Sequence, residues 1–320
     1  MSDLSPSPEL IRCEGTSAAA PVHEAYPVRT AELGGGLSVR RALPHPARRL
    51  VGPWCFLDHF GPLSFTGGKP MDVPPHPHIG LQTVTWIIAG EVLHKDSLGN
   101  EQLIRPGALN LMTAGNGIAH SEETPARHSG RLHGVQLWTA LPAERRKSTA
   151  AFEHYPALPE AGFGACRAVL LMGRLGAQRS PAVAYSPIVG AELGAGRDGS
   201  AEVPLEPGFE HALLLIEGSA ALEGEALAPD RLYYLGVGRA RLTLALRRGV
   251  RLMLIGGAPF GESILMWWNF VARAPEEIAE ARSDWDARRR FGEVGAYAGE
   301  RLAAPAFVGR LKASCCGSNR

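Results

Sequence analysis

Cysteine and net charge are scarce in this sequence of 320 residues, and each absence narrows what the protein can be. The five cysteines are odd in number and include no Cys-x-x-Cys pair, which argues against a disulfide framework and favours the reducing cytoplasm. The 33 basic and 32 acidic residues leave a net charge of +1, so the composition gives no sign of electrostatic binding to nucleic acid or anionic lipid.

Long apolar segments, of the kind that cross a membrane or direct secretion, are missing as well. The most apolar run, residues 264–271, is short and contains Asn269. The first residues, MSDLSPSPELIRCEG, lack the apolar core of a secretory signal. We therefore expect a cytoplasmic protein with neither a membrane partner nor a direct nucleic-acid partner. Cys315 and Cys316 lie in a polar tail, which we expect to be a flexible terminus rather than a redox sensor.

Glycine and proline, in contrast, are abundant, with 38 and 25 residues, and indicate many turns. The hydrophobic share of 45% is enough to bury sizeable cores, and the length suits two domains. Strand-like segments such as residues 81–88 alternate with turns at Gly90, Ser97–Asn100 and Pro106–Gly107. These features predict an all-β protein.

Two short motifs carry the residues that point to chemistry. His76 and His78 are two apart, and so are His120 and Glu122. Residues i and i+2 of a strand point to the same face, so each pair offers two side-by-side ligands. If the two strands meet, three imidazoles and one carboxylate converge on a first-row transition metal, Fe(II) included, with open coordination positions.

For several polar residues in and near these motifs, a purely structural role is an alternative to metal binding. A lone His-x-His pair is more often surface or core histidine than a ligand pair, and the second pair is what shifts the balance. Asp58 and His59 interrupt an apolar run and either approach the metal or only hold their strand. For His94 a solvent or core position is at least as good an interpretation as a ligand role.

Longer stretches around the motifs resemble the pirin family, a branch of the cupin superfamily. The resemblance is carried by PHPHIGLQTVTWIIAGEVLHKDSLGNEQLIRPGALNLMTAGNGIAHSEE and, nearer the C-terminus, by GGAPFGESILMWWNFVARAPEEIAEA. It covers most of residues 28–292. It implies two cupin (jelly-roll) barrels in tandem, with one mononuclear iron in the N-terminal barrel held by His76, His78, His120 and Glu122. Many cupins have a glutamate where this chain has Gln82, which we expect to hydrogen-bond a ligand or bound molecule instead.

The expected organisation has five parts. A flexible N-terminal arm (1–26) precedes the metal-binding barrel (27–143), and a linker (144–165) leads to a second barrel (166–272) and a C-terminal helix with its tail (273–320). The second barrel contains one histidine, His211, and no His-x-His or His-x-Glu pair, so we expect it to be metal-free.

Two local patterns predict a turn and a helix within these parts. Residues 194–199 spell G-x-G-x-x-G, but a proline-broken, strand-like segment follows instead of a helix, so we interpret them as a turn and not as a nucleotide-binding loop. Pro275 predicts the start of a helix, Arg288–Arg290 its last turn and Gly292 its stop. We expect that helix to pack against the barrels.

The resemblance also implies an activity, namely quercetin 2,3-dioxygenase. A flavonol would lose its 3-hydroxyl proton near Glu122, which acts as ligand and general base, and dioxygen would open the ring with release of carbon monoxide. The alternative is an iron-binding regulator of a transcription factor or metabolic enzyme. Mn, Ni, Cu or Co could replace Fe(II), the small-molecule partners would be a flavonol-like aromatic and O2, and a monomer is expected.

Overall fold

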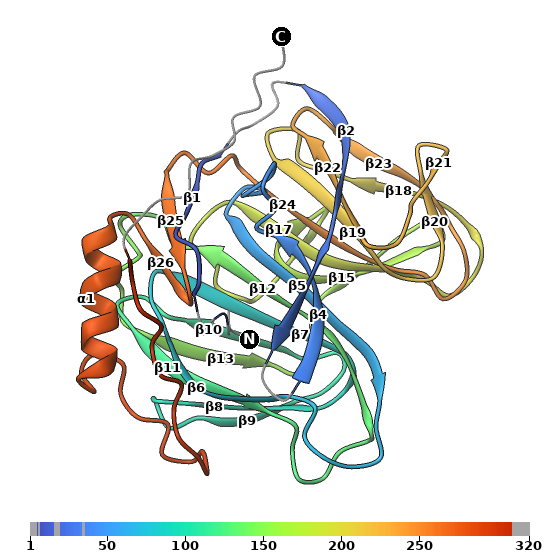
Figure 1. Cartoon of the computed structure of the whole chain (residues 1–320). Coiled ribbons are helices and arrows are strands. Elements are labelled where there is room, and N and C mark those ends of the chain that lie inside the picture. Colours follow the sequence, from blue (N-terminus) through green and yellow to red (C-terminus); the bar gives the residue numbers. More distant parts are fainter. Residues whose placement is uncertain (1–4, 6, 16–19, 34–35, 309–320) are drawn as a thin grey trace.

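Alternating side chains and glycine or proline turns build antiparallel strands throughout the computed structural model, which describes residues 5, 7–15, 20–33 and 36–308. The strands form two barrels side by side, and one helix in the described part of the chain lies against the N-terminal barrel (Figure 1). The all-β tandem-barrel fold predicted from the sequence is confirmed. No helix among the described residues is long and apolar enough to span a membrane.

The N-terminal barrel consists of a seven-stranded sheet and a four-stranded sheet. The larger has the order β13 (Ala151–Tyr155), β10 (Leu109–Thr113), β7 (Leu81–Gly90), β12 (Arg131–Ala140), β5 (Trp54–Ser64), β4 (Leu37–Leu43) and β3 (Arg29–Leu33). The smaller has the order β6 (Asp72–His78), β11 (Ile118–Glu123), β8 (Val92–Asp96) and β9 (Glu101–Ile104).

The C-terminal barrel repeats this plan with an eight-stranded and a four-stranded sheet. The larger has the order β14 (Glu160–Phe163), β15 (Cys166–Leu175), β17 (Ile188–Ala195), β24 (Arg251–Gly257), β19 (Glu210–Glu217), β22 (Arg231–Gly236) and β2 (Pro21–Pro27), with β16 (Gln178–Arg179) paired to β15. The smaller has the order β18 (Gly199–Pro204), β23 (Arg241–Leu246), β20 (Ala220–Leu222) and β21 (Glu225–Ala226).

A fifth sheet lies beside the N-terminal barrel, next to the helix (Figure 1). It joins β1 (Ile11–Cys13), β25 (Ile264–Trp267) and β26 (Phe270–Ala272), and α1 (Pro275–Asp286) follows directly. Ile278, Ala281 and Trp285 form the buried stripe of the helix, as their spacing predicts. A backbone bridge between Ile79 and Phe270 connects this C-terminal layer to the end of β6.

The two large sheets pack face to face through one apolar cluster. Val84 and Leu137 of the N-terminal barrel share it with Leu171 and Met253 of the C-terminal barrel. The buried Trp54 indole donates to the backbone oxygens of Val189 and Gly256, at 3.1 and 3.0 Å. Burying such large apolar faces stabilises the pair of barrels as a unit, at roughly 25 cal/mol per Å².

The structure differs from the expected boundaries in four places. The expected N-terminal arm contains two strands, because β1 pairs with β25 and β2 with β22, and backbone pairing depends little on a Ser-, Pro- and Ala-rich composition. The expected linker contains β13 and β14, so only residues 156–159 connect the barrels. β25 and β26 lie in the layer next to the N-terminal barrel and not in the C-terminal barrel.

The fourth difference is the end of the helix, which stops at Asp286 instead of continuing through the arginines. Arg288 and Arg290 have left-handed backbone conformations, with φ of 55° and 69°, which a right-handed helix cannot continue through. Arg289 and Arg290 pair instead with the Asp284 carboxylate of the helix.

Two other expectations concern short segments. Residues 194–199 are the end of β17, a turn and the first residue of β18, so the interpretation as a turn is confirmed. Cys315 and Cys316 lie outside the described residues.

Candidate metal centre

The two motifs lie on neighbouring strands. β6 and β11 are antiparallel, and their register places His76 directly opposite His120, with His78 opposite Ile118. β6 is an edge strand of its sheet, as expected from Pro77, which cannot donate to a ladder. All three imidazoles are fully buried, at 0% exposure, and they offer nitrogen atoms within 4.8 Å of one another.

The hydrogen bonds of the rings indicate which nitrogen each one offers. His76 Nδ1 lies 2.9 Å from the Pro74 carbonyl oxygen, and His78 Nδ1 lies 3.0 Å from the Asn269 carbonyl oxygen. A carbonyl oxygen only accepts, so we assign the ring proton to Nδ1 in both residues. The lone pair of each ring is therefore on Nε2.

These Nε2 atoms point to a common centre. His78 Nε2 and His120 Nε2 are 3.1 Å apart, and His76 Nε2 is buried without a hydrogen-bond partner. Two acceptor nitrogens have no reason to approach each other unless a proton or a cation lies between them, and an unpaired buried nitrogen costs free energy. The donor set thus fits a transition metal.

Burial also keeps these histidines in the form that binds metals. It lowers the pKa of His76 to about 3 and the pKa values of His78 and His120 well below 6.5, with the neighbouring imidazoles adding to the effect on the last two. The rings are therefore neutral near pH 7, and each keeps a lone pair for coordination.

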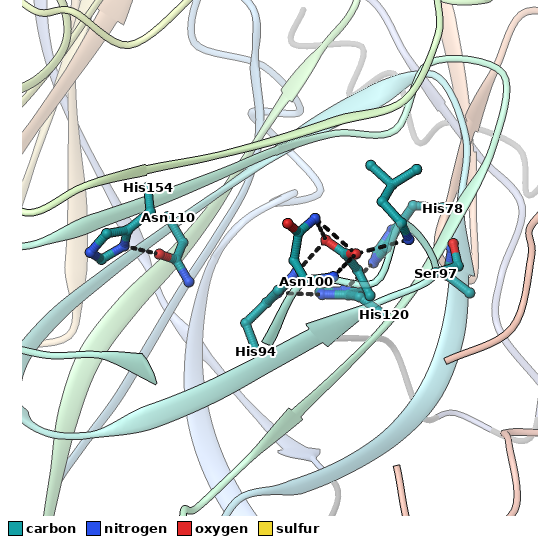
Figure 2. A network of polar contacts seen from close by, with 10 residues as sticks. His78, His94, Ser97, Asn100, Asn110, His120 and His154 are labelled. Atoms are coloured by element: carbon teal, nitrogen blue, oxygen red, sulfur yellow. Dashed lines mark hydrogen bonds and ion pairs between the residues drawn. The ribbon is translucent and has the colours of Figure 1, made fainter. Parts of the chain in front are cut away.

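A hydrogen-bonded series of polar residues, His94, Asp96 and Asn100, contacts the Nδ1 side of the His120 ring (Figure 2). His120 Nδ1 lies 3.3 Å from His94 Nδ1, and His94 Nε2 lies 3.1 Å from Asp96 Oδ2. Asp96 is held in turn by the side-chain amide of Asn100 and by backbone N–H groups of the following turn. The carboxylate accepts a hydrogen bond from the His94 Nε2–H, so His94 Nδ1 can accept a hydrogen bond from the His120 Nδ1–H, which leaves His120 Nε2 for a metal.

Asp96 is a functional candidate that the sequence did not indicate, and His94, for which a core position was one interpretation, supports His120. His94 is only 4% exposed, and its ring stacks on Phe152 with centroids 4.4 Å apart. The available signal was their spacing of two on one strand, the same period that singled out the ligand pairs.

Glu122 lies on β11 two residues after His120 and is 1% exposed. Between these two residues the pairing with β6 shifts, so that Glu122 faces Val73 across the ladder. Prolines 74 and 75 occupy the shifted stretch of β6. In the described part of the chain, the donor atoms within 4.8 Å of one another belong to the three histidines and not to Glu122. Its role as a fourth ligand stays a prediction.

Gln82 does not face the histidines, which corrects the role expected for it. Gln82 lies on β7 between Thr113 of β10 and Thr139 of β12. Its amide nitrogen donates to Thr113 Oγ1 and to the Val183 carbonyl oxygen. The next residue, Thr83, lies opposite Trp138, which contacts His78. Alternation along a strand therefore directs Gln82 to the other face, toward the C-terminal barrel.

Asp58 and His59 hold their strand instead of approaching the cluster. Asp58 accepts two hydrogen bonds from Arg41, at 2.9 and 2.8 Å. His59 Nε2 lies 2.9 Å from His133 Nε2 and 3.0 Å from an Arg40 guanidinium nitrogen. Of the two interpretations of Asp58 and His59, the structure therefore supports the one in which they hold their strand.

Comparison with known proteins assigns the family. Residues 36–139 match the Pirin family and residues 189–292 match the Pirin C-terminal cupin domain. The chain belongs to the pirin family. The relatives of this pirin include a Pseudomonas aeruginosa protein named "Putative quercetin 2,3-dioxygenase PA1205", 49% identical over 89% of this chain and 90% of the relative. A pirin-like protein of Caulobacter vibrioides is 40% identical over 80% of this chain and 90% of its own length.

A solved structure, a quercetin 2,3-dioxygenase from Acinetobacter baumannii, is similar to this pirin over both barrels. The two are 44% identical and superpose with a TM-score of 0.88, covering 91% of this chain and 98% of the other. The likeness confirms the cupin fold and the arrangement of two barrels.

Proposed function

We propose that this pirin is a metal-dependent dioxygenase of the quercetin 2,3-dioxygenase type, with Fe(II) as its metal and a flavonol-like aromatic and O2 as its substrates. The observation that carries the proposal is the convergence of three neutral, buried imidazole Nε2 atoms. The names of the similar Pseudomonas and Acinetobacter proteins support the reaction type.

His76, His78 and His120 would hold the metal, which when bound supplies Lewis acidity toward an enolate and redox chemistry with dioxygen. Glu122 is proposed as the fourth ligand and as the base that accepts the proton of the flavonol 3-hydroxyl. The burial of Glu122 and its position two residues after His120 support this proposal, because a general base must come within hydrogen-bond reach of the proton it removes.

Trp138 is the proposed wall on which the flavonol rings lie. Its indole meets the His78 ring edge-on, with centroids 5.2 Å apart, and stacks on Phe56 at 4.0 Å. The Trp138 Nε1–H is buried without a hydrogen-bond partner, so it is a donor available to an oxygen of a bound substrate.

The test is aerobic turnover of quercetin by the Fe(II)-loaded protein, followed by loss of the flavonol absorbance and by release of carbon monoxide. We expect His76→Ala and His120→Ala to lose bound metal and turnover together. His154→Ala is the matched control, because His154 hydrogen-bonds Asn110 away from the cluster (Figure 2). If the parent binds metal but releases no carbon monoxide with Fe, Mn, Ni, Cu or Co, the dioxygenase proposal fails and the regulatory alternative takes its place.

Glu122→Gln separates the two roles proposed for that residue. The amide keeps the size of the side chain but cannot accept the substrate proton, so turnover should fall by about 10²–10⁴-fold. Metal content measured on the same sample shows whether the carboxylate is also a ligand. Unchanged turnover would remove Glu122 from the catalytic residues.

A further inference from the structure

A second candidate site lies in the C-terminal barrel, away from the histidine cluster. A cavity of about 1240 Å³ is bordered by the β15–β16 hairpin, by residues 180–184 and 186–189, by the end of β18 and by the start of β19. Its apolar lining includes Leu158, Val183 and Phe209. Val183 is 42% exposed, so part of this apolar surface is in contact with solvent. A concave, partly apolar cavity of this size accommodates a small organic molecule.

A buried polar side chain lines this cavity. His211 is 0% exposed, and neither ring nitrogen has a hydrogen-bond partner in the described part of the chain. It shares the inward face of β19 with Leu213 and Leu215, whose neighbours are otherwise apolar. A buried imidazole without partners is costly unless something binds it.

His211 is neutral at physiological pH. Burial lowers its pKa to about 4 and Arg239 adds to the shift, whereas the nearby Phe209 backbone, which lies outside hydrogen-bonding geometry, opposes it. A neutral imidazole has one N–H donor and one acceptor nitrogen, so it suits a hydroxyl group, which both donates and accepts. A single imidazole does not hold a metal by itself.

The rim of the cavity carries two arginines that face each other. Arg174 and Arg179 are directly opposite across the β15–β16 hairpin, both exposed and both lining the cavity. Neither has an ion-pair partner among the described residues, and the only carboxylate in the lining, Glu206, forms no such pair with them. Like charges directly opposite in a ladder destabilise it, and a bound anion reverses that repulsion.

We propose that this cavity binds a small aromatic carboxylate that carries a phenolic hydroxyl. The carboxylate lies between the Arg174 and Arg179 guanidiniums, the ring lies on the apolar lining, and the hydroxyl reaches His211. This site holds whether or not the histidine cluster of the other barrel turns over a flavonol, because the two share none of the residues named here.

Titration calorimetry with three probes of increasing length tests the proposal: 4-hydroxybenzoate, 4-hydroxyphenylacetate and 4-hydroxycinnamate. We expect at least one to bind one-to-one, more weakly at raised salt. Its neutral amide analogue should bind about tenfold or more weakly, because it loses the charge-assisted hydrogen bonds. If none of the three acids binds, or if the amides bind as tightly as the acids, the proposal is wrong.

Variants place the site in the cavity. Arg174→Ser with Arg179→Ser should weaken binding by about tenfold or more. Arg241→Ser is the control, since Arg241 is also exposed on the same barrel but does not line the cavity. His211→Phe should remove the preference for hydroxylated acids over benzoate, phenylacetate and cinnamate. Full affinity in the double arginine variant would overturn the proposal, and that result does not depend on how His211→Phe folds.

Discussion

The hydrogen bonds of three ring nitrogens decide what the histidine cluster can bind. The Nδ1 atoms of His76 and His78 each donate to a backbone oxygen, whereas the Nδ1 of His120 meets another histidine, His94. A backbone carbonyl fixes the tautomer by itself. A second imidazole does so only if its own proton is held elsewhere, and Asp96 holds it.

The first prediction concerns His94 and Asp96, which hold His120 through hydrogen bonds. His94→Ala and Asp96→Asn should each weaken metal binding by about 10–100-fold, because His120 loses the partner that orients its ring and keeps Nε2 free. Competition with a chelator measures the affinity, and His154→Ala serves as the control. Parent-like affinity in both variants would show that His120 needs no such support.

A second prediction uses the buried pair His59 and His133. Burial and the nearby Arg40 lower their pKa values from 6.5 to about 2 and about 4. Below pH 6.5 the two rings bind protons in the unfolded chain but not in the folded chain. Their contribution to the free energy of unfolding is therefore fully present above pH 6.5 and is lost as the pH drops toward 4. The loss is up to about 1.4 kcal/mol per pH unit for each such histidine.

Urea unfolding at several pH values measures this effect. His133→Gln removes one of the two titrating rings and should make the fall between pH 6.5 and 4 shallower. Equal slopes for parent and variant would assign the acid sensitivity to other groups.

At the scale of the element, two segments that are far apart in the sequence position the histidine cluster: β6 and the turn between β25 and β26. β6 brings two of the clustered histidines from an edge strand, where Pro77 is tolerated. The turn between β25 and β26 supplies the Asn269 carbonyl that orients His78. α1 packs on this turn region through Ile278 and Trp285, in one cluster with Phe270. The C-terminal layer therefore supports the histidine cluster.

The third prediction tests this support. Ile278→Ala leaves a cavity under α1 and should lower the free energy of unfolding by about 2–4 kcal/mol. Ala279→Gln, on the exposed face of the same helix, should change it by less than about 0.5 kcal/mol. Thermal unfolding and denaturant titration compare the two variants. Equal effects would mean that the helix contributes little through its buried face.

At the scale of the whole molecule, the barrels exchange segments. β2, from the N-terminal end of the chain, completes the large sheet of the C-terminal barrel. The C-terminal layer of β25, β26 and α1 returns to the N-terminal barrel (Figure 1). Polar contacts cross the apolar interface too: the Gly52 N–H donates to the buried Glu210, and the Trp86 indole donates to Glu192. Separating the barrels would leave both carboxylates without these partners.

The fourth prediction follows from this exchange. The chain should unfold in a single cooperative transition, with circular dichroism and tryptophan fluorescence giving the same midpoint. A fragment ending at residue 158 should fail to fold alone, because it lacks the C-terminal layer and exposes the apolar face of its large sheet. Two separated transitions, or a folded and soluble fragment, would contradict the prediction.

Much of the fold and the histidine set could be predicted from the sequence, because both depend on local periodicity. Residues two apart on a strand share a face whatever the rest of the chain does, which is why His76 and His78 could be paired in advance. The same rule failed for Gln82, because its face depends on which neighbours the strand meets. Strand β2 was missed because its pairing with β22 comes from backbone groups that composition does not reveal.

The sequence by itself determined the strand pattern, the turns and the two ligand motifs, since each is a property of residues close together in the chain. Only the tertiary structure decided which ring nitrogens point to the metal centre. His78 is oriented by Asn269, 191 residues away, and His120 by His94, 26 residues away. Such contacts form only when distant strands pack, because the free energy of placing a buried polar group depends on partners that the fold brings to it.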